Sequence, residues 1–405
     1  MAPISVLFTH FGDDWIRGSE TVLLDLLRSL DQSRIRPVVW CNGAEMEEAA
    51  RAAGYPTYRS EFRHFLDYSS PRLSPAFFAG LVKRCRALCR EHDIRVLHAN
   101  SAAPVQWLVP AGFGARLPVL AHLHIDYLRR SRYVLLLHAA TLAVGVSRQV
   151  IDGLIADGMA PERTKIIHNG IDTSRLGGSA TDLRAALGIP ADAFTVMTAG
   201  SLIERKGHDL LIRAFQSLPL EPVPPRLLIL GDGPERERLA ALAASLGLED
   251  RIHFLGHTKE VGAAYRAADL FALASRGDSF GLVLAEAGHF ELPSVSTRVG
   301  GIPEVVIDEE TGLLVPPDDV PALAAALAKL MADPARREQL GRAAAARVEA
   351  MFTVERMARR FEETYAALAA IPAAELGWGN AARILRPYAQ LIRATGKPRQ
   401  ARYAS

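Results

Sequence analysis

Short apolar runs alternate with longer amphipathic segments along most of this chain. In its first half, strand-length runs such as residues 4–8, 36–41, 94–98 and 119–123 are separated by segments long enough to form helices. Short buried strands that alternate with helices are typical of parallel sheets covered by helices on both faces. The pattern therefore predicts an α/β fold.

The alternation is interrupted once, near the middle of the chain. Residues 177–182 contain two glycines and no side chain that needs burial, which is typical of a linker. Strand-length runs resume at residues 194–199, and 405 residues are enough for two domains that each have their own core. We predict two doubly wound, Rossmann-like parallel-sheet domains facing each other across a cleft, the first over residues 1–175 and the second over residues 176–350.

The end of the chain follows a different pattern. Residues 351–371 place apolar side chains on one helix face, and residues 372–405 form a basic extension with Glu375 as its only acidic residue. Two interpretations of this extension remain open. It is either a solvated tail with one packing helix or a surface that makes peripheral contact with anionic lipid.

Charge and cysteine content narrow the classes of function. The 47 basic and 45 acidic residues leave a net charge of +2, which gives no field strong enough to attract nucleic acid. Cys41, Cys85 and Cys89 lack the spacing of a zinc site, so we expect buried free thiols in a reducing compartment. The chain begins without a basic leader and has no apolar run of about twenty residues. We expect a cytoplasmic protein, located at the inner face of the membrane if the extension binds lipid.

Residues 277–286, Gly-Asp-Ser-Phe-Gly-Leu-Val-Leu-Ala-Glu, lie between a predicted buried strand and a helix predicted to start at Leu282. A helix N-terminus attracts anions because its first N–H groups are unpaired and its dipole is positive there. Asp278 lies in the turn, and Glu286 lies about two helical turns further along. A diphosphate between two polyhydroxyl groups fits these features. The alternative is a surface turn with a capping Asp and a solvated Glu.

This stretch resembles the signature of the family-4 retaining glycosyltransferases of the GT-B fold, which has two Glu at the same separation around Ser-Phe-Gly. The resemblance extends from about residue 4 to about residue 365, because residues 168–172, 231–234 and 300–304 match further loops in family order. It implies a glycosyl or hexosyl transferase of polysaccharide or glycolipid synthesis. The donor would be a UDP- or GDP-sugar and the acceptor a glycan or lipid-linked molecule, with no cofactor and no metal.

The resemblance also implies roles for residues of the second domain. Glu286 would hold the ribose, and Asp278 the transferred sugar. In the loop of residues 200–207, Lys206 matches the family Lys that neutralises the diphosphate, whereas Ser201 replaces the family Arg and Arg205 is the candidate to substitute for it. Fixed cations stabilise the charge that builds on a departing diphosphate. The other residues assigned to donor binding in this domain are Ser279, Phe280, Gly281 and Leu282.

In the first domain the resemblance points to Gly18 and His124. Gly18 belongs to a loop expected to face the donor phosphates or the acceptor; Arg17 replaces a second family glycine there and fits an acidic acceptor. Ser19 is a good N-cap for the following helix. His124 matches the family histidine near the reacting sugar, and His122, on the same side of the strand, is the second candidate. A structural histidine is the alternative for both.

Two other functions remain open at this level. A GT-B epimerase would convert the nucleotide sugar without an acceptor. A non-catalytic nucleotide-sugar-binding partner of a glycan assembly complex would bind the donor without turnover. Ser201 and Asp278 both depart from the family pattern, which keeps the second alternative open.

Overall fold

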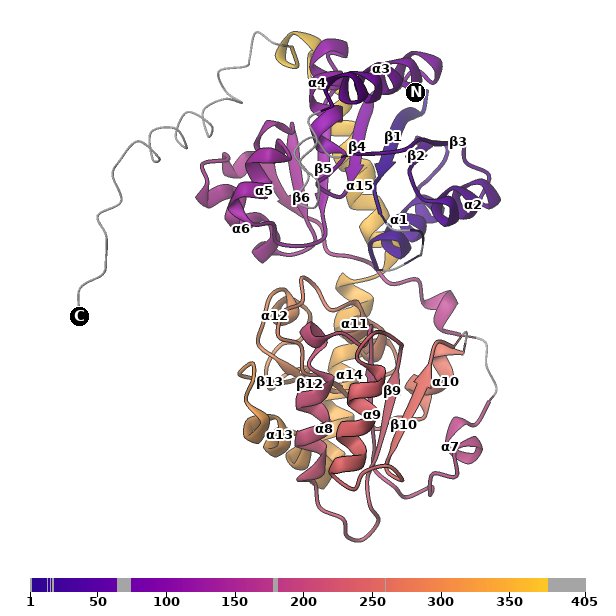
Figure 1. The fold of residues 1–405 in the computed structure, drawn as a ribbon, viewed down its shortest axis with the longest axis vertical. Coiled ribbons are helices and arrows are strands. Elements are labelled where there is room, and N and C mark those ends of the chain that lie inside the picture. The colour runs from indigo at the N-terminus through magenta and orange to yellow at the C-terminus, as the bar shows by residue number, and fades with distance from the viewer. Residues whose placement is uncertain are drawn as a thin grey trace, which may run out of the picture. The chain divides into compact units, whose positions relative to one another are not determined.

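The structure is a computed structural model that describes residues 2–377 except 13, 15, 17, 64–73, 178–180 and 259. The chain forms two compact units (Figure 1). Unit 1 consists of Met1–Ile167 and Met357–Ser405, and unit 2 of His168–Arg356. Arg17, residues 178–180 of the predicted linker and residues 378–405 of the basic extension lie outside the described residues.

Unit 1 contains a parallel sheet in the order β3-β2-β1-β4-β5-β6-β7. The chain moves outward from β1 in one direction and then returns to β4 on the other side of β1. Ligands of such sheets bind at the carboxyl ends of the two strands where the order reverses, which here are β1 and β4. The strands are β1 (Ile4–His10), β2 (Ile35–Cys41), β3 (Thr57–Arg59), β4 (Val96–Asn100), β5 (Val119–Leu123), β6 (Leu142–Gly145) and β7 (Thr164–Ile166).

Helices lie on both faces of this sheet (Figure 1). The described helices of unit 1 are α1 (Gly18–Ser29), α2 (Ala44–Ala52), α3 (Pro75–Glu91), α4 (Val105–Ala115), α5 (Arg129–Val134) and α6 (Arg148–Ala156), with short 3₁₀ turns η1 (Leu137–Ala139), η2 (Pro161–Arg163) and η5 (Ala373–Glu375). One further helix, α15 (Val354–Ala369), enters unit 1 at Met357.

The apolar face of α15 packs on the middle of the sheet. The Tyr365 hydroxyl lies 2.7 Å from Nδ1 of His98 on β4, and its ring meets Phe8 of β1 edge-on, with 5.9 Å between ring centroids. Glu362 accepts a hydrogen bond from the backbone N–H of Asp31 at 2.9 Å and pairs with Arg34 at 2.6 Å. The C-terminal helix is therefore an integral part of unit 1.

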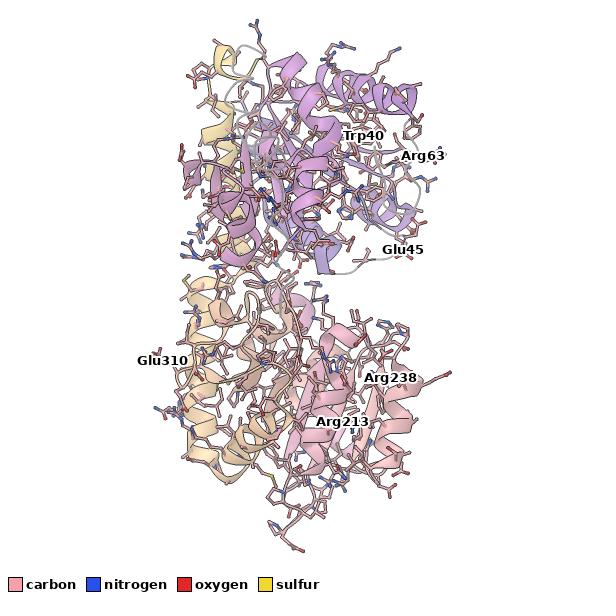
Figure 2. All side chains as sticks on the ribbon, turned by 60° about the vertical axis from the view of Figure 1, so that its left-hand side comes forward. Trp40, Glu45, Arg63, Arg213, Arg238 and Glu310 are labelled. Atoms are coloured by element: carbon pink, nitrogen blue, oxygen red, sulfur yellow. The ribbon has the colours of Figure 1, made fainter. Side chains whose placement is uncertain are left out.

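A second aromatic cluster stabilises the other side of unit 1. Trp40 on β2 is fully buried; its ring lies 4.9 Å from Phe62 and 6.3 Å from Trp107 on α4. Figure 2 shows Trp40 inside the unit, whereas Glu45 and Arg63 lie at its surface. Burying each such side chain contributes about 1.5–3 kcal/mol of hydrophobic stabilisation.

Unit 2 contains a parallel sheet in the order β10-β9-β8-β11-β12-β13, so its strand order reverses between β8 and β11. The strands are β8 (Thr195–Ala199), β9 (Arg226–Leu230), β10 (Ile252–Gly256), β11 (Leu270–Leu273), β12 (Ser294–Thr297) and β13 (Gly312–Val315). The described helices are α7 (Leu183–Ala186), α8 (His208–Gln216), α9 (Arg236–Ser245), α10 (Val261–Arg266), α11 (Leu282–His289), α12 (Ile302–Val305), α13 (Val320–Ala332) and α14 (Pro334–Met351), with η3 (Thr173–Leu176) and η4 (Glu204–Lys206).

Helix α8 of unit 2 is amphipathic. In α8, Leu211 and Phe215 join the buried core, whereas Arg213 is exposed. Figure 2 shows Arg213 and Arg238 on the outer side of the unit. The predicted α/β class with two doubly wound parallel sheets is confirmed. Within the described ranges, every helix is too short or too polar to cross a membrane.

Candidate active site

The loops that follow β8 and β11 meet at the strand-order reversal of unit 2. Lys206, at the end of η4, places Nζ 2.6 Å from Oδ2 of Asp278. Gly207 has a φ of +66°, and a Cβ at this position would lie 1.9 Å from the carbonyl oxygen of Ala274. Only glycine combines this backbone conformation with so close an approach. The local sequence thus brings the predicted Lys and Asp together.

Asp278 also orders the turn that precedes helix α11. Its Oδ1 accepts hydrogen bonds from the backbone N–H groups of Phe280 at 3.3 Å and Gly281 at 3.0 Å, just before the helix begins at Leu282. Burial alone would raise the pKa of Asp278, but the Lys206 ammonium and the N–H groups hold that pKa below its usual value. Asp278 is therefore a carboxylate, and both of its oxygens accept hydrogen bonds.

The neighbouring basic residues hold the two loops together. Arg205 is exposed and donates from Nη1 to the carbonyl oxygen of Gly277 at 2.6 Å. Arg276 makes two hydrogen bonds of 2.9 Å to Asp209 and one of 2.9 Å to Asp318. A planar guanidinium fits a carboxylate in this two-point geometry, which orders the loops without a ligand.

Phe280 has two separate roles in this arrangement. Its side chain is 3% exposed and packs against His168 and Phe352, with ring centroids 5.8 Å and 5.5 Å away. Its backbone N–H donates a hydrogen bond to Oδ1 of Asp278. The loop that precedes α12 is tied to the same turn, because Gly301 N donates to the Asp278 carbonyl at 2.9 Å. Side-chain packing therefore positions the backbone of residues 278–281.

Glu286 lies on α11, in the wall of a cavity of about 220 Å³ at the carboxyl ends of β8, β9 and β10. Its Oε2 accepts a hydrogen bond of 2.7 Å from the Tyr265 hydroxyl. Burial raises the pKa of Glu286, and the Tyr265 hydrogen bond opposes that rise. Among the described residues, the cavity is lined by Ala199, Gly200, Ser201, Leu230, Gly231, Asp232, Gly256, His257, Thr258, Val261 and Glu286.

The structure therefore brings Ser201 and Glu286 into one cavity wall and joins Lys206 to Asp278. Three polar lining residues, Asp232, His257 and Thr258, were not predicted as site residues. Asp232 lies in the loop of residues 231–234, which matches a loop of the family. His257 and Thr258 directly follow β10, and their position after a strand was the available signal.

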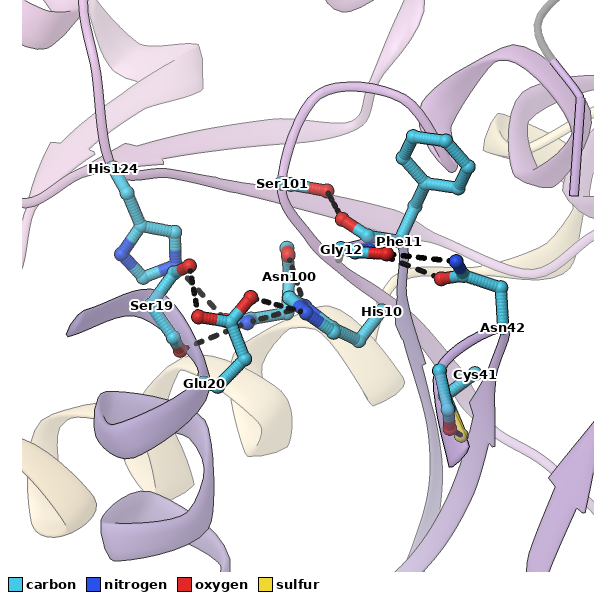
Figure 3. A network of polar contacts seen from close by, with 11 residues as sticks. His10, Phe11, Gly12, Ser19, Glu20, Cys41, Asn42, Asn100, Ser101 and His124 are labelled. Carbon is cyan, nitrogen blue, oxygen red and sulfur yellow. Dashed lines mark hydrogen bonds and ion pairs between the residues drawn. The ribbon is translucent and has the colours of Figure 1, made fainter. Parts of the chain in front are cut away.

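In unit 1, His124 belongs to a buried polar network at the ends of β1 and β4 (Figure 3). His124 Nε2 lies 3.0 Å from Oδ1 of Asn100, and His10 Nε2 lies 2.9 Å from Oε1 of Glu20. A Cβ on Gly12 would lie 2.5 Å from His10 Nε2 and 2.6 Å from Glu20 Oε1, so the loop after β1 passes directly over this pair. His10, Glu20 and Asn100 were not predicted as site residues.

The start of helix α1 differs from the prediction. The helix begins at Gly18, so Ser19 is its second residue and the prediction that Ser19 is the N-cap was wrong. The Ser19 hydroxyl donates to Oε2 of Glu20 at 3.0 Å instead. A buried carboxylate nearby satisfies the hydroxyl better than the helix end does. Gly18 is exposed at the helix start, beside this network.

His122, the second candidate, is a core residue. It is fully buried, and its ring packs against His124 and Phe361 at centroid distances of 4.2 Å and 4.9 Å. Neither of its ring nitrogens has a hydrogen-bond partner among the described residues.

Burial, with a smaller effect of His10, lowers the pKa of His124 to about 3. The His124 ring is therefore neutral near pH 7.

Two doubly wound parallel sheets, with a lysine paired to a carboxylate at the strand reversal of the second, are typical of the GT-B class of glycosyltransferases. The profile described as "Glycosyltransferase Family 4" matches residues 16–175, and that described as "Glycosyl transferases group 1" matches residues 179–347. The chain belongs to the family-4 glycosyltransferases. The predicted family and the predicted GT-B fold are both confirmed.

Individual relatives agree with this assignment. The chain is 40% identical over 197 residues to D-inositol 3-phosphate glycosyltransferase of Saccharomonospora viridis, a match that covers 46% of each protein. The chain thus spans less than half of that relative's length. It is 29% identical to a GDP-mannose-dependent alpha-(1-6)-phosphatidylinositol monomannoside mannosyltransferase of Mycolicibacterium smegmatis, over 75% of this chain and 81% of that protein.

A solved structure shows the same fold. HepE of Anabaena, crystallised in complex with UDP, superposes with a TM-score of 0.78 over 90% of this chain and 100% of that one, at 24% identity. A second structure of HepE, in complex with UDP-glucose, gives a TM-score of 0.76.

Proposed function

We propose that this protein transfers a sugar from a nucleoside-diphosphate sugar to an acceptor, with retention of the anomeric configuration. The observation that carries this proposal is the geometry of unit 2. Lys206 is paired to Asp278 at the N-terminus of α11, and Glu286 of the same helix lines a cavity. One helix therefore offers an anion site at its start and a carboxylate about one turn further on.

In this proposal the cavity holds the nucleoside. Glu286 accepts hydrogen bonds from the ribose hydroxyls, and Ser201 lines the wall where the diphosphate leaves the cavity. UDP bound to HepE supports a uridine nucleotide, and the GDP-mannose dependence of the mycolicibacterial relative supports a guanosine nucleotide. We propose a UDP- or GDP-sugar as the donor.

The reaction breaks the bond between the anomeric carbon and the donor phosphate. The acceptor oxygen forms its new bond on the same face of the sugar, and its proton passes to the leaving phosphate oxygen. Lys206, assisted by Arg205 and the N–H groups at the start of α11, stabilises the charge on that oxygen. Asp278 and the backbone of residues 279–282 hold the sugar hydroxyls, and His124 holds a substrate hydroxyl from unit 1.

The acceptor and the cellular location follow from the same proposal. The inositol phosphate and phosphatidylinositol mannoside named for the relatives support a phosphorylated or lipid-linked polyol as acceptor, in glycolipid or polysaccharide synthesis. We propose a cytoplasmic enzyme that reaches the membrane through its basic extension, residues 372–405. Co-sedimentation with anionic vesicles tests this: full-length protein should bind, and a chain ending at Gly377 should not.

The test of the proposed activity is a screen of nucleotide sugars in which release of the nucleoside diphosphate is measured with and without acceptors. Acceptor-dependent release with a retained anomer supports the proposal. Conversion of the donor into another nucleotide sugar without acceptor would identify an epimerase instead. Tight donor binding without release over all acceptors would identify a non-catalytic binding protein.

A further inference from the structure

A chain of hydrogen bonds runs from α1 through β1 and β4 to the residue that follows β5 (Figure 3). Glu20 contacts His10 at 2.9 Å, His10 Nδ1 lies 3.0 Å from Asn100 Nδ2, and Asn100 Oδ1 lies 3.0 Å from His124 Nε2. Glu20 is 5% exposed, His10 2% and Asn100 0%. Because these three residues are buried, water does not compete for their donors and acceptors, and the direction of each hydrogen bond can be determined.

The direction starts at Glu20. Burial alone would raise its pKa, but the hydrogen bond and charge of His10 lower the pKa of Glu20 to about 2. Glu20 is therefore ionised near pH 7 and can only accept hydrogen bonds. His10 must then carry a hydrogen on Nε2 and donate it to Oε1 of Glu20.

The orientation of the Asn100 amide is fixed next. Its Nδ2 lies 3.3 Å from the carbonyl oxygen of Ser19, which can only accept. The same nitrogen lies 3.0 Å from His10 Nδ1, but that ring nitrogen also lies 3.0 Å from the backbone carbonyl oxygen of Asn100, so it does not by itself fix the amide. The Ser19 contact does. Reversing the amide would place its oxygen against Ser19 O, so the nitrogen faces Ser19 and the oxygen faces His124.

The amide oxygen accepts only from a protonated nitrogen, so the hydrogen of the neutral His124 ring lies on Nε2. Nδ1 is then a bare lone pair. The side chain is half-buried, and Nδ1 makes no hydrogen bond within the described part of the chain. The His122 ring packs against the His124 ring, with 4.2 Å between the ring centroids, and limits its rotation.

We propose that Asn100 is a positioning residue that holds His124 in the Nε2–H tautomer, so that Nδ1 accepts a hydrogen bond from a substrate hydroxyl. The inference rests on the proposed function for the identity of that hydroxyl, which belongs to the sugar or the acceptor. The inference assigns His124 the role of a hydrogen-bond acceptor and excludes it as a general acid. The Glu20–His10 pair acts one step further away, by holding the Asn100 amide.

The tautomer can be measured directly in the full-length protein by ¹⁵N NMR of the histidine rings, because protonated and bare imidazole nitrogens have well-separated shifts. The His124 signals are assigned with His124→Ala. We expect Nδ1 of His124 to be bare in the wild type, and a mixture of tautomers in Asn100→Ala. A wild-type ring protonated on Nδ1 would overturn the inference, whether or not Asn100→Ala folds.

Kinetic measurements provide a second test of the inference. Asn100→Ala should lower the kcat/KM of sugar transfer about tenfold, the worth of one neutral hydrogen bond. In a His124→Ala background the same change should have no further effect, because coupled residues are not additive. Asn100→Asp keeps an acceptor toward Nε2 and should retain the tautomer and recover most of the rate. Fully additive losses would assign Asn100 a merely structural role and contradict the inference.

A matched control removes a hydrogen bond elsewhere in unit 1. Ser60→Ala deletes the partner of Trp40 Nε1, at 2.9 Å, and should leave both the tautomer and the rate unchanged. The two proposals fail separately. If no nucleotide sugar is turned over but Nδ1 is bare, the proposed function fails and the tautomer assignment stands. If transfer occurs with Nδ1 protonated, only the present inference fails.

Discussion

Lys206 and Asp278 form an ion pair, with 2.6 Å between Nζ and Oδ2, although they are 72 residues apart in the sequence. The ammonium proposed to hold the diphosphate is thus paired with a carboxylate. Under the proposed function, a diphosphate would compete with Asp278 for Lys206.

The competition predicts opposite effects of the two partners on nucleotide binding. Asp278→Asn removes the competing charge, so UDP or GDP should bind about three- to tenfold more tightly, while Lys206→Ala should weaken binding by a similar factor. Isothermal titration measures both. Weaker binding by Asp278→Asn would show that the carboxylate assists the diphosphate site.

Lys206→Ala should also lower sugar transfer by about 10²–10³-fold, because a preorganised cation at the leaving oxygen is lost. Nucleoside diphosphate release in the presence of acceptor is the readout. Lys329→Ala is the matched control, since Lys329 pairs with Glu309 on the surface of the same unit and should not affect the rate. Equal rates for Lys206→Ala and Lys329→Ala would remove Lys206 from its proposed role.

Stability measurements separate the turn hydrogen bonds of Asp278 from its ion pair. Asp278→Ala loses both, and the loss of the two turn hydrogen bonds should lower the free energy of unfolding of unit 2 by about 1 kcal/mol. Asp278→Asn keeps an oxygen that can accept from Gly281 N and should be less destabilised. Urea unfolding of both variants gives the comparison; if they lose the same free energy, the turn hydrogen bonds contribute nothing.

Donor binding should depend on pH through Glu286. Burial raises the pKa of Glu286, and only its carboxylate form accepts two ribose hydrogen bonds, so nucleotide affinity should fall as the pH drops through that raised pKa. Tyr265→Phe removes a hydrogen bond that lowers this pKa. In this variant, nucleotide affinity should therefore begin to fall at a higher pH. Tyr55→Phe, which removes a hydrogen bond to Leu27 O in unit 1, should leave the pH dependence of nucleotide affinity unchanged.

Unit 1 should lose stability in mild acid because of His122. Burial lowers the pKa of His122 well below 6.5, so the unfolded chain takes up a proton that the folded chain excludes. The stability from this group is complete above about pH 6.5 and falls as the pH drops below that value, by roughly 1 kcal/mol per pH unit. His122→Leu should flatten the decline of the melting temperature between pH 7.5 and 5.5. An unchanged slope, or an equal effect of substituting the exposed His289, would contradict this.

The two loops that carry Lys206 and Asp278 could be predicted because each is a short contiguous stretch of sequence. Lys206 and Asp278 each occupy a loop between a strand and a helix, and the β/α alternation already placed both loops at the carboxyl end of one sheet. Their direct pairing could not be predicted, because it depends on Gly207 letting one loop touch the backbone of the other.

The network in unit 1 escaped prediction for a different reason. His10 and Asn100 are 90 residues apart and become neighbours only because β4 pairs with β1. Each is, by itself, an ordinary polar residue at the end of a strand. The wrong prediction that Ser19 is an N-cap has the same origin. The Ser19 hydroxyl donates to the Glu20 carboxylate, and that carboxylate is buried only once the sheet has formed.

The close passage of Gly12 over the His10–Glu20 pair restricts how the protein can be engineered. Any side chain at position 12 would meet both ring nitrogen and carboxylate, so acceptor-directed libraries that randomise the whole loop after β1 would consist largely of inactive members. Keeping glycine at this one position while varying a surface residue such as Ile16, which is 41% exposed, preserves the buried contact between His10 and Glu20 and leaves sequence space open to selection.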